Sequence, residues 1–188
     1  VLALSSESGG SASSAFVPME AVLQQAFSIL ENAWSYRRIS SISETDGLTG
    51  LPNVRHFRER VRVEHARARR YKDPYGIMMI DIDHFKKVND VYGHPVGDTV
   101  LRELAAILKE VARETDLPAR YGGEEFIVFM PKTKLPEVVQ AGERLRKAVE
   151  RKVFAAPSPL LRCTISIGIA DFRPGFEGNE QEVVRRAD

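Results

Sequence analysis

Acidic residues occur at the ends of two apolar segments of this 188-residue chain. In YGIMMIDID, Asp81 and Asp83 are two positions apart, so in a strand both side chains lie on one face. In RYGGEEFIVFMP, Glu124 follows two glycines directly. Ionised carboxylates beside a core are costly unless they cap a helix, pair with a base or bind a cation. Asp83 has the first alternative, as the N-cap of a helix over HFKKVNDVYG, and the sequence leaves that choice open.

A strand that carries Glu124 beside the strand of Asp81 would bring the two carboxylates together across a sheet. They would form an oxygen cage suited to a hard divalent cation such as Mg²⁺. Gly122 and Gly123 would let a bulky anion approach the backbone closely. The alternative is an exposed hairpin whose charges deter edge pairing, but two acidic strand ends together favour the metal site.

The segment between these ends, FKKVNDVYGHPVGD, supplies Lys86, Asn89, His94 and Asp98. An amide with a carboxylate can read the acceptor and donors of a guanine edge, and a lysine can meet phosphates as a point charge. Each residue also has a structural alternative: Asn89 near a helix C-terminus, His94 in a turn, and Asp98 as the N-cap of the next helix. Their grouping between two candidate metal-binding ends favours the nucleotide.

These residues need a scaffold, and hydrophobic periodicity with turn residues predicts one. We expect GG to form a two-residue hairpin turn with positive φ between strands DLPARYGG and EEFIVFMP. The order β-α-α-β-β-α-β predicts an α/β fold with a mostly antiparallel central sheet flanked by helices. The expected helices are 53–71, 84–92, 98–113, 136–151 and one opening at 180, and the other expected strands are 75–83 and 162–171.

The first part of the chain differs from the rest in composition and hydrophobic pattern. Residues 1–17 are rich in Ser and Gly and predict a flexible linker or the remnant of an upstream domain. Residues 18–44 carry an amphipathic pattern that predicts a helical stalk, whose self-association the sequence leaves open.

The composition of the chain limits the classes of partner and the setting that the sequence supports. The 27 basic and 26 acidic residues nearly cancel, so bulk charge supports neither a DNA or RNA partner nor a membrane surface. The single cysteine, Cys163, excludes an intramolecular disulfide and favours a reducing, cytoplasmic setting. No apolar run is long enough to predict a membrane span.

Four motifs in order, DGLTGLPN, DIDHFKKVNDVYGHPVGD, RYGGEEF and TISIGIA, resemble the GGDEF-domain diguanylate cyclases of bacteria. The resemblance covers residues 45–188 and implies a fold like that of nucleotidyl cyclases and polymerase palms. It also implies that further residues complete the domain after Asp188, including a lysine near the phosphates. The stalk would then be a signalling and dimerisation helix.

The resemblance implies that a homodimer condenses two GTP molecules into cyclic di-GMP, with two Mg²⁺ or Mn²⁺ ions per active site. Asp81, the backbone carbonyl of Ile82 and Glu124 would hold the metals. Glu124 and Glu125 are the two candidate proton acceptors. The substrate would be bound by Lys86, Asn89, His94, Asp98, Gly122 and Gly123.

A second site is implied upstream of the hairpin. Arg113 and Asp116, in RETD, match the RxxD motif with which this family binds its product as an inhibitor. Arginine can donate two parallel hydrogen bonds to a phosphate or to guanine, and the carboxylate can accept hydrogen bonds from guanine. Arg144 resembles a further arginine that reaches the same ligand from a neighbouring subunit. The structural alternative is a surface pair at a helix end.

Three other functions compete with this interpretation. One is a catalytically silent module that binds GTP or cyclic di-GMP, and the presence of Asp81, Glu124, Asn89 and Asp98 argues against it. A second is a cyclase that makes a mixed dinucleotide, which Asp98 disfavours because a carboxylate suits guanine. A purely structural dimerisation domain leaves the two acidic strand ends unexplained.

Overall fold

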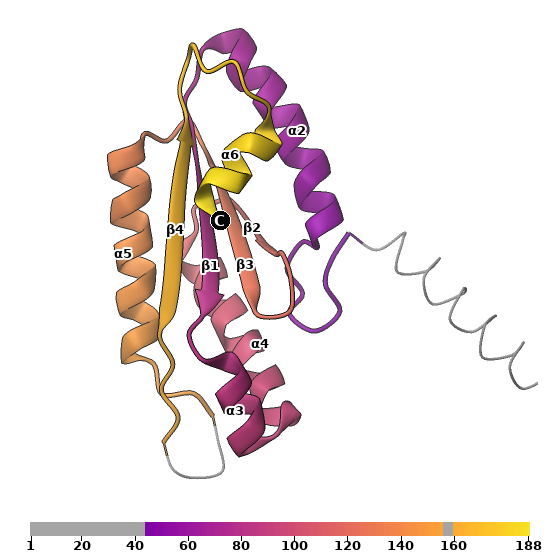
Figure 1. Ribbon diagram of the computed structural model, residues 1–188, viewed down its shortest axis with the longest axis vertical. Helices are drawn as coiled ribbons and strands as arrows, with labels where there is room; N and C mark the ends of the chain where they lie inside the picture. Colours follow the sequence, from indigo (N-terminus) through magenta and orange to yellow (C-terminus); the bar gives the residue numbers. More distant parts are fainter. Residues whose placement is uncertain (1–43, 156–159) are drawn as a thin grey trace, which may run out of the picture. The chain divides into compact units, whose positions relative to one another are not determined.

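The computed structural model describes residues 44–155 and 160–188 of the chain (Figure 1). The linker expected at 1–17 and the stalk expected at 18–44 therefore fall, except for Glu44, outside the described residues. Within those residues no helix is long and apolar enough to cross a membrane.

The core of the described part is a four-stranded sheet in the order β2-β3-β1-β4. Its members are β1 (Tyr75–Ile82), β2 (Leu117–Arg120), β3 (Glu125–Pro131) and β4 (Ile165–Phe172). Every pairing is antiparallel, and β1 is enclosed between β3 and β4. The predicted fold class and the predicted order of elements are confirmed.

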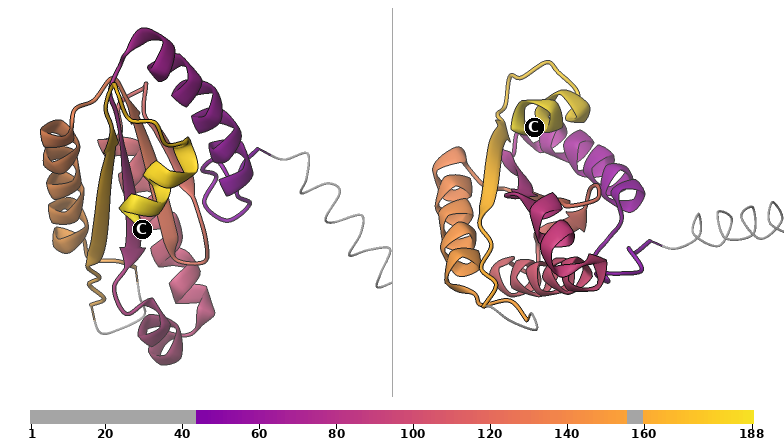
Figure 2. Two further views of the ribbon diagram at one scale, coloured as in Figure 1. Left: turned by 45° about the horizontal axis from the view of Figure 1, so that its top comes forward. Right: turned by 60° about the horizontal axis from the view of Figure 1, so that its bottom comes forward.

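Helices cover both faces of the sheet (Figures 1 and 2). Met78, Ile80 and Ile82 of β1 pack into the core beneath the first group of helices, while Ile77 and Met79 pack on the opposite side. Asp81 shares the face of Ile77 and Met79, because side chains alternate along a strand. The first group is α3 (Phe85–Tyr92), α4 (His94–Val111) and α5 (Leu135–Arg151), and the second is α2 (Val54–Tyr71) and α6 (Glu180–Ala187).

Two helix starts show how local sequence sets the boundaries. Helix α2 begins after Asn53, whose side-chain oxygen accepts a hydrogen bond of 2.9 Å from the amide of His56. Helix α4 begins at His94 rather than at Asp98, and Pro95 occupies its first turn, where proline costs no hydrogen bond. Asp98 therefore lies inside the helix and is not its N-cap.

Candidate active site

The end of β1 presents Asp81 beside two neighbouring strands. The register pairs Asp81 with Glu125 of β3 and with Ser166 of β4. The side chain of Asp81 is open to solvent, but partial burial and then the negative charge of Asp83 raise the pKa of its carboxyl. In the described part of the chain no ion pair involves Asp81, Glu124 or Glu125. The acids at this edge are left without a basic partner.

Asp83 has a different environment, although it follows on the same face. Its two carboxylate oxygens accept hydrogen bonds of 2.6 Å from the hydroxyls of Thr164 and Ser166. Burial alone would raise the pKa of Asp83, but these two donors outweigh it and lower the pKa. The N-cap of α3 is His84, in the left-handed region at φ 58°, with no side-chain cap. Asp83 is therefore tied to β4, and the alternative of a helix cap is wrong.

The hairpin between β2 and β3 differs from the predicted two-residue turn. The strands end at Arg120 and resume at Glu125, so the loop comprises Tyr121, Gly122, Gly123 and Glu124. The amides of Tyr121 and Gly122 both donate to the carbonyl of Glu125, at 2.9 and 3.2 Å. Neither glycine has positive φ, so the expected reason for the GG pair is wrong. At Gly122, a Cβ atom would instead overlap the carboxylate of Glu125.

The loop places the two glutamates differently from the expectation. Glu125 is the first residue of β3 and the direct cross-strand neighbour of Asp81, the position that the sequence suggested for Glu124. Glu124 precedes the strand and is partly exposed at the loop. The chain thus offers the carboxylates of Asp81, Glu124 and Glu125 at the end of the sheet where β1 ends and β3 begins, and we call this end the β1 edge.

The substrate candidates lie on the helical hairpin of α3 and α4. Asn89 of α3 packs against Gly97 of α4 so closely that a Cβ at Gly97 would overlap its side-chain oxygen. Asp98 is the next residue of α4 after Gly97, and Asn89 and Asp98 are both partly exposed. Lys86 and His94 are exposed at the same hairpin.

The donors at the β1 edge are oxygens, the ligands that Mg²⁺ and Mn²⁺ prefer. They comprise the carboxylates of Asp81, Glu124 and Glu125, with backbone carbonyls. The side chain of Ile82 is buried in the core, so only its backbone is available. Among the residues described, no group of three or more His, Cys, Asp or Glu side chains is arranged to hold a metal. The chemistry of the donors fits a hard divalent cation that also takes phosphate oxygens.

The RxxD residues form a turn at the end of α4. The carboxylate of Asp116 accepts a hydrogen bond of 2.9 Å from the amide of Arg113. Its second oxygen, Oδ1, is buried and has no hydrogen-bond partner in the described part. Burial raises the pKa of Asp116, against the opposing charges of Arg113 and Arg144.

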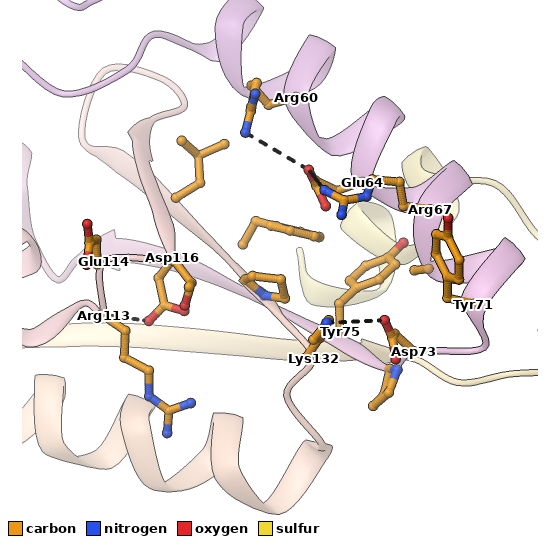
Figure 3. A pocket seen from close by; sticks show the side chains of 16 residues that line it. Arg60, Glu64, Arg67, Tyr71, Asp73, Tyr75, Arg113, Glu114, Asp116 and Lys132 are labelled. Atoms are coloured by element: carbon orange, nitrogen blue, oxygen red, sulfur yellow. Dashed lines mark hydrogen bonds and ion pairs between the residues drawn. The ribbon is translucent and has the colours of Figure 1, made fainter.

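Arg113 and Asp116 border a surface groove of about 830 Å³. Figure 3 shows Arg113, Glu114 and Asp116 on one side and Arg60, Glu64 and Arg67 of α2 on the other. The groove is separate from the β1 edge, because none of the residues that line it belongs to the hairpin loop.

Sequence reasoning missed four residues that organise the acidic edge. Thr164 and Ser166 hold Asp83, and Arg120 joins Asp46 to the hairpin loop. All four lie inside or beside motifs noted in the sequence, but only the fold shows what they contact.

Comparison with known proteins identifies the family. Residues 43–188 match the family model described as "Diguanylate cyclase, GGDEF domain", so the chain belongs to this family. The response regulator PleD of Caulobacter vibrioides is 43% identical over 150 residues, which are 78% of this chain and 33% of PleD. Diguanylate cyclase A of Treponema denticola is 36% identical over 171 residues, covering 89% of this chain and 46% of that protein. The chain spans less than half the length of these curated relatives.

Solved structures agree with the sequence match. The coiled coil and GGDEF domain of DgcB from Caulobacter crescentus, in complex with c-di-GMP, superposes with a TM-score of 0.73 at 30% identity. That match covers 90% of each chain. Diguanylate cyclase SiaD from Pseudomonas aeruginosa, in complex with its activator SiaC, gives 0.73 at 35% identity, covering 90% of this chain and 66% of SiaD.

Proposed function

We propose that this protein is a diguanylate cyclase that converts two GTP molecules into cyclic di-GMP and two pyrophosphates. The observation that carries the proposal is the pairing of Asp81 with Glu125 at the sheet edge, with no basic side chain among the described residues to balance them. Membership of the GGDEF family gives this edge its chemistry.

The chain's own part in metal binding follows from its donors. Asp81, the carbonyl of Ile82 and Glu124 would hold two Mg²⁺ or Mn²⁺ ions, and the register position of Glu125 opposite Asp81 supports a share of Glu125 in the ligation. Once bound, the cations would lower the pKa of the attacking hydroxyl and offset charge on the phosphorus oxygens. The uncompensated charge of the acids favours a divalent cation at this edge.

Substrate binding falls to the elements around the edge. Asn89 and Asp98 would read the guanine edge as amide and carboxylate, and the packing of Asn89 against Gly97, the neighbour of Asp98 in sequence, supports a joint role. Lys86 and His94 are exposed and can meet phosphates. Gly122 and Gly123 leave the backbone of the hairpin open to the triphosphate.

In the reaction, the 3′-hydroxyl of one GTP attacks the α-phosphorus of the other. A new P–O bond forms, the bond between the α-phosphorus and the bridging oxygen breaks, and pyrophosphate leaves. The reciprocal attack by the other 3′-hydroxyl closes the ring and releases the second pyrophosphate. The hydroxyl proton passes to Glu124 or Glu125. Because each GTP is held by one subunit, the two half-sites meet in a homodimer with two-fold symmetry. GTP as substrate fits the cytoplasm of a bacterium.

Product inhibition is assigned to the RxxD turn. The unpaired Oδ1 of Asp116 is an acceptor that guanine N1 and N2 can satisfy. Arg113 is exposed and Arg144 lies within electrostatic reach of Asp116, so both can meet phosphate or guanine. Cyclic di-GMP carries both groups.

The test is incubation with GTP, ATP and Mg²⁺ and identification of the products by mass. We expect cyclic di-GMP and pyrophosphate from GTP alone. Binding of GTP without turnover would contradict the proposal and indicate a silent binding module. A product that contains adenine would indicate a mixed-dinucleotide cyclase.

A further inference from the structure

Arg120, the last residue of β2, makes more side-chain hydrogen bonds than any other described residue near the hairpin. Its Nε and Nη2 donate to the backbone carbonyls of Gly122 and Gly123, with a shortest distance of 2.7 Å from Nη2 to Gly123. Its Nη1 donates to both carboxylate oxygens of Asp46, at 3.1 and 3.2 Å. One guanidinium therefore ties the glycine pair to a residue 74 positions away in sequence.

The anchor for Arg120 is the turn that begins at Asp46. The carboxylate of Asp46 also accepts from the amide and the hydroxyl of Thr49, at 2.9 and 2.7 Å. Backbone bonds join Asp46 to Leu51 and Gly50, and Lys109 of α4 donates to the carbonyl of Gly50 at 3.2 Å. The carboxylate that receives Arg120 is thus fixed from several directions.

The hairpin loop itself has few means of holding its shape. Gly122 and Gly123 have no side chains, and glycine loses more conformational freedom on ordering than any other residue. Within the loop the amides of Tyr121 and Gly122 share one acceptor, the carbonyl of Glu125. Arg120 and Asp46 are mostly buried, with side chains 17% and 23% exposed, so their ion pair is shielded more than a surface pair. Arg120 supplies the fixed donors that the loop lacks.

We infer that Arg120 is a positioning residue: its guanidinium, anchored on Asp46, fixes the Gly122–Gly123 backbone and so sets the place of Glu124 in the loop and of Glu125 opposite Asp81. The inference rests on the proposed function. It concerns no contact between Arg120 and the substrate, since the guanidinium is already engaged with the carbonyls and with Asp46. A planar fork of five donors is required, which lysine does not provide.

The test combines turnover with amide hydrogen exchange in Arg120→Ala, Arg120→Lys and Asp46→Asn. For Arg120→Ala we expect kcat to fall about 100-fold, as a misplaced catalytic group does, with a much smaller change in the KM for GTP. We expect the amides of Tyr121 and Gly122 to exchange about tenfold faster, because the loop opens more often. Arg120→Lys should restore only part of either property.

Arg146→Ala is the matched control. Arg146 also forms a forked ion pair, with Glu143 at 2.8 and 2.9 Å, but it lies on α5, far along the chain from the hairpin. This variant should keep the parent kcat and the parent exchange rates at Tyr121 and Gly122.

The outcomes are distinguishable. Parent kcat, or parent exchange rates at the hairpin, in Arg120→Ala would overturn the inference, and so would a loss of kcat without faster exchange. If Arg120→Ala does not fold, Asp46→Asn decides by the same two measurements, because it keeps the side-chain shape and removes the charge. If the parent protein makes no cyclic di-GMP, the proposed function fails, while the exchange experiment still tests whether Arg120 holds the loop.

Discussion

Asp81 and Asp83 stand two positions apart on β1 and its continuation, yet their surroundings are opposite. Asp83 receives two hydroxyl donors from the β4 side, whereas Asp81 faces Glu125 and has no cation beside it in the described part of the chain. The first arrangement satisfies an acid with hydrogen bonds, so Asp83 supports the structure. The second leaves negative charge that a divalent cation can satisfy.

Removing the charge of Asp81 should therefore abolish turnover and leave the fold intact. For Asp81→Asn we expect kcat to fall by about 100-fold or more, in line with the loss of a metal ligand or its partners. Glu125→Gln should also lower kcat, because Glu125 shares the edge with Asp81. Steady-state kinetics with GTP and Mg²⁺, together with the Tm of each variant, measures both effects. Full activity of Asp81→Asn would contradict the assignment.

Asp46 gives a prediction about stability and pH. Burial would raise the pKa of its carboxyl, but hydrogen bonds from Thr49 and then Arg120 outweigh burial and lower the pKa below its ordinary 3.8. A group with a lowered folded-state pKa stabilises the protein above its unfolded pKa, and this contribution is lost as pH falls through the folded value. As pH falls below about 5, and most steeply below 3.8, the unfolding free energy should thus decrease less for Asp46→Asn than for the parent.

Asp90→Asn is the control for this experiment, since Asp90 is exposed on α3. We expect the unfolding free energy of this variant to fall with pH as it does in the parent. Parallel curves for Asp46→Asn and the parent would show that the Asp46 carboxylate adds nothing to the acid dependence.

At the α3–α4 hairpin, side-chain packing bears on the proposed recognition of the substrate. Gly97 lies against Asn89 and Phe85, and a Cβ at Gly97 would be 3.2 Å from the Phe85 ring and would overlap the Asn89 side-chain oxygen. Because the end of the asparagine side chain can move more easily than the ring, Gly97→Ala should displace the amide that we assign to guanine. We expect a KM for GTP raised about tenfold, the effect of one lost hydrogen bond to the substrate, with a smaller loss of kcat.

Gly47→Ala is the matched variant, because nothing lies within 4 Å of a Cβ at Gly47. It should keep the parent KM. An unchanged KM in Gly97→Ala, with the protein folded, would remove the support for Asn89 as a guanine contact.

These elements show what the sequence could and could not predict. The strand YGIMMIDID and the helices on either side were predictable because a continuous apolar run and amphipathic periodicity are local features, although the suggested cap of α3 at Asp83 was wrong. The hairpin was not: GG fits a two-residue turn as well as the observed four-residue loop, and the difference decides whether Glu124 or Glu125 faces Asp81. Asp83 was equally open, since its donors Thr164 and Ser166 come from a strand about 80 residues later.

The Asp46–Arg120 pair lay beyond sequence reasoning for the same reason. Both residues belong to motifs that the sequence displays, DGLTGLPN and RYGGEEF, but no local pattern pairs them. Only the sheet, which sets β2 beside the turn after Asp46, brings them together.

Under the proposed function, the complete reaction would need two copies of the protein. Each subunit would contribute one set of acids and one guanine site, so a single copy could hold GTP but could not close the cyclic product. We therefore expect specific activity to rise with protein concentration until the dimer is fully populated. Sedimentation at the assay concentrations gives the dimer fraction. Constant specific activity across conditions in which the dimer dissociates would contradict a shared active site.

Feedback should be separable from catalysis, since none of Asp81, Glu124 and Glu125 lines the RxxD groove. For Arg113→Ala we expect the concentration of cyclic di-GMP that halves the rate to rise about tenfold or more, because a charge-assisted contact is lost. The initial rate should not change. Arg102→Ala, an exposed arginine of α4, is the control and should keep the parent inhibition. Parent inhibition in Arg113→Ala would place the inhibitory site elsewhere.

The central claim is that Asp81 and the hairpin glutamates share a divalent cation. Binding of Mn²⁺, followed by electron paramagnetic resonance in the presence of GTP, tests it most directly in the parent, in Asp81→Asn and in the control Asp90→Asn. The account predicts tight Mn²⁺ binding in the parent and in Asp90→Asn, and a dissociation constant raised about tenfold or more in Asp81→Asn. Equal Mn²⁺ affinity in all three proteins would contradict it.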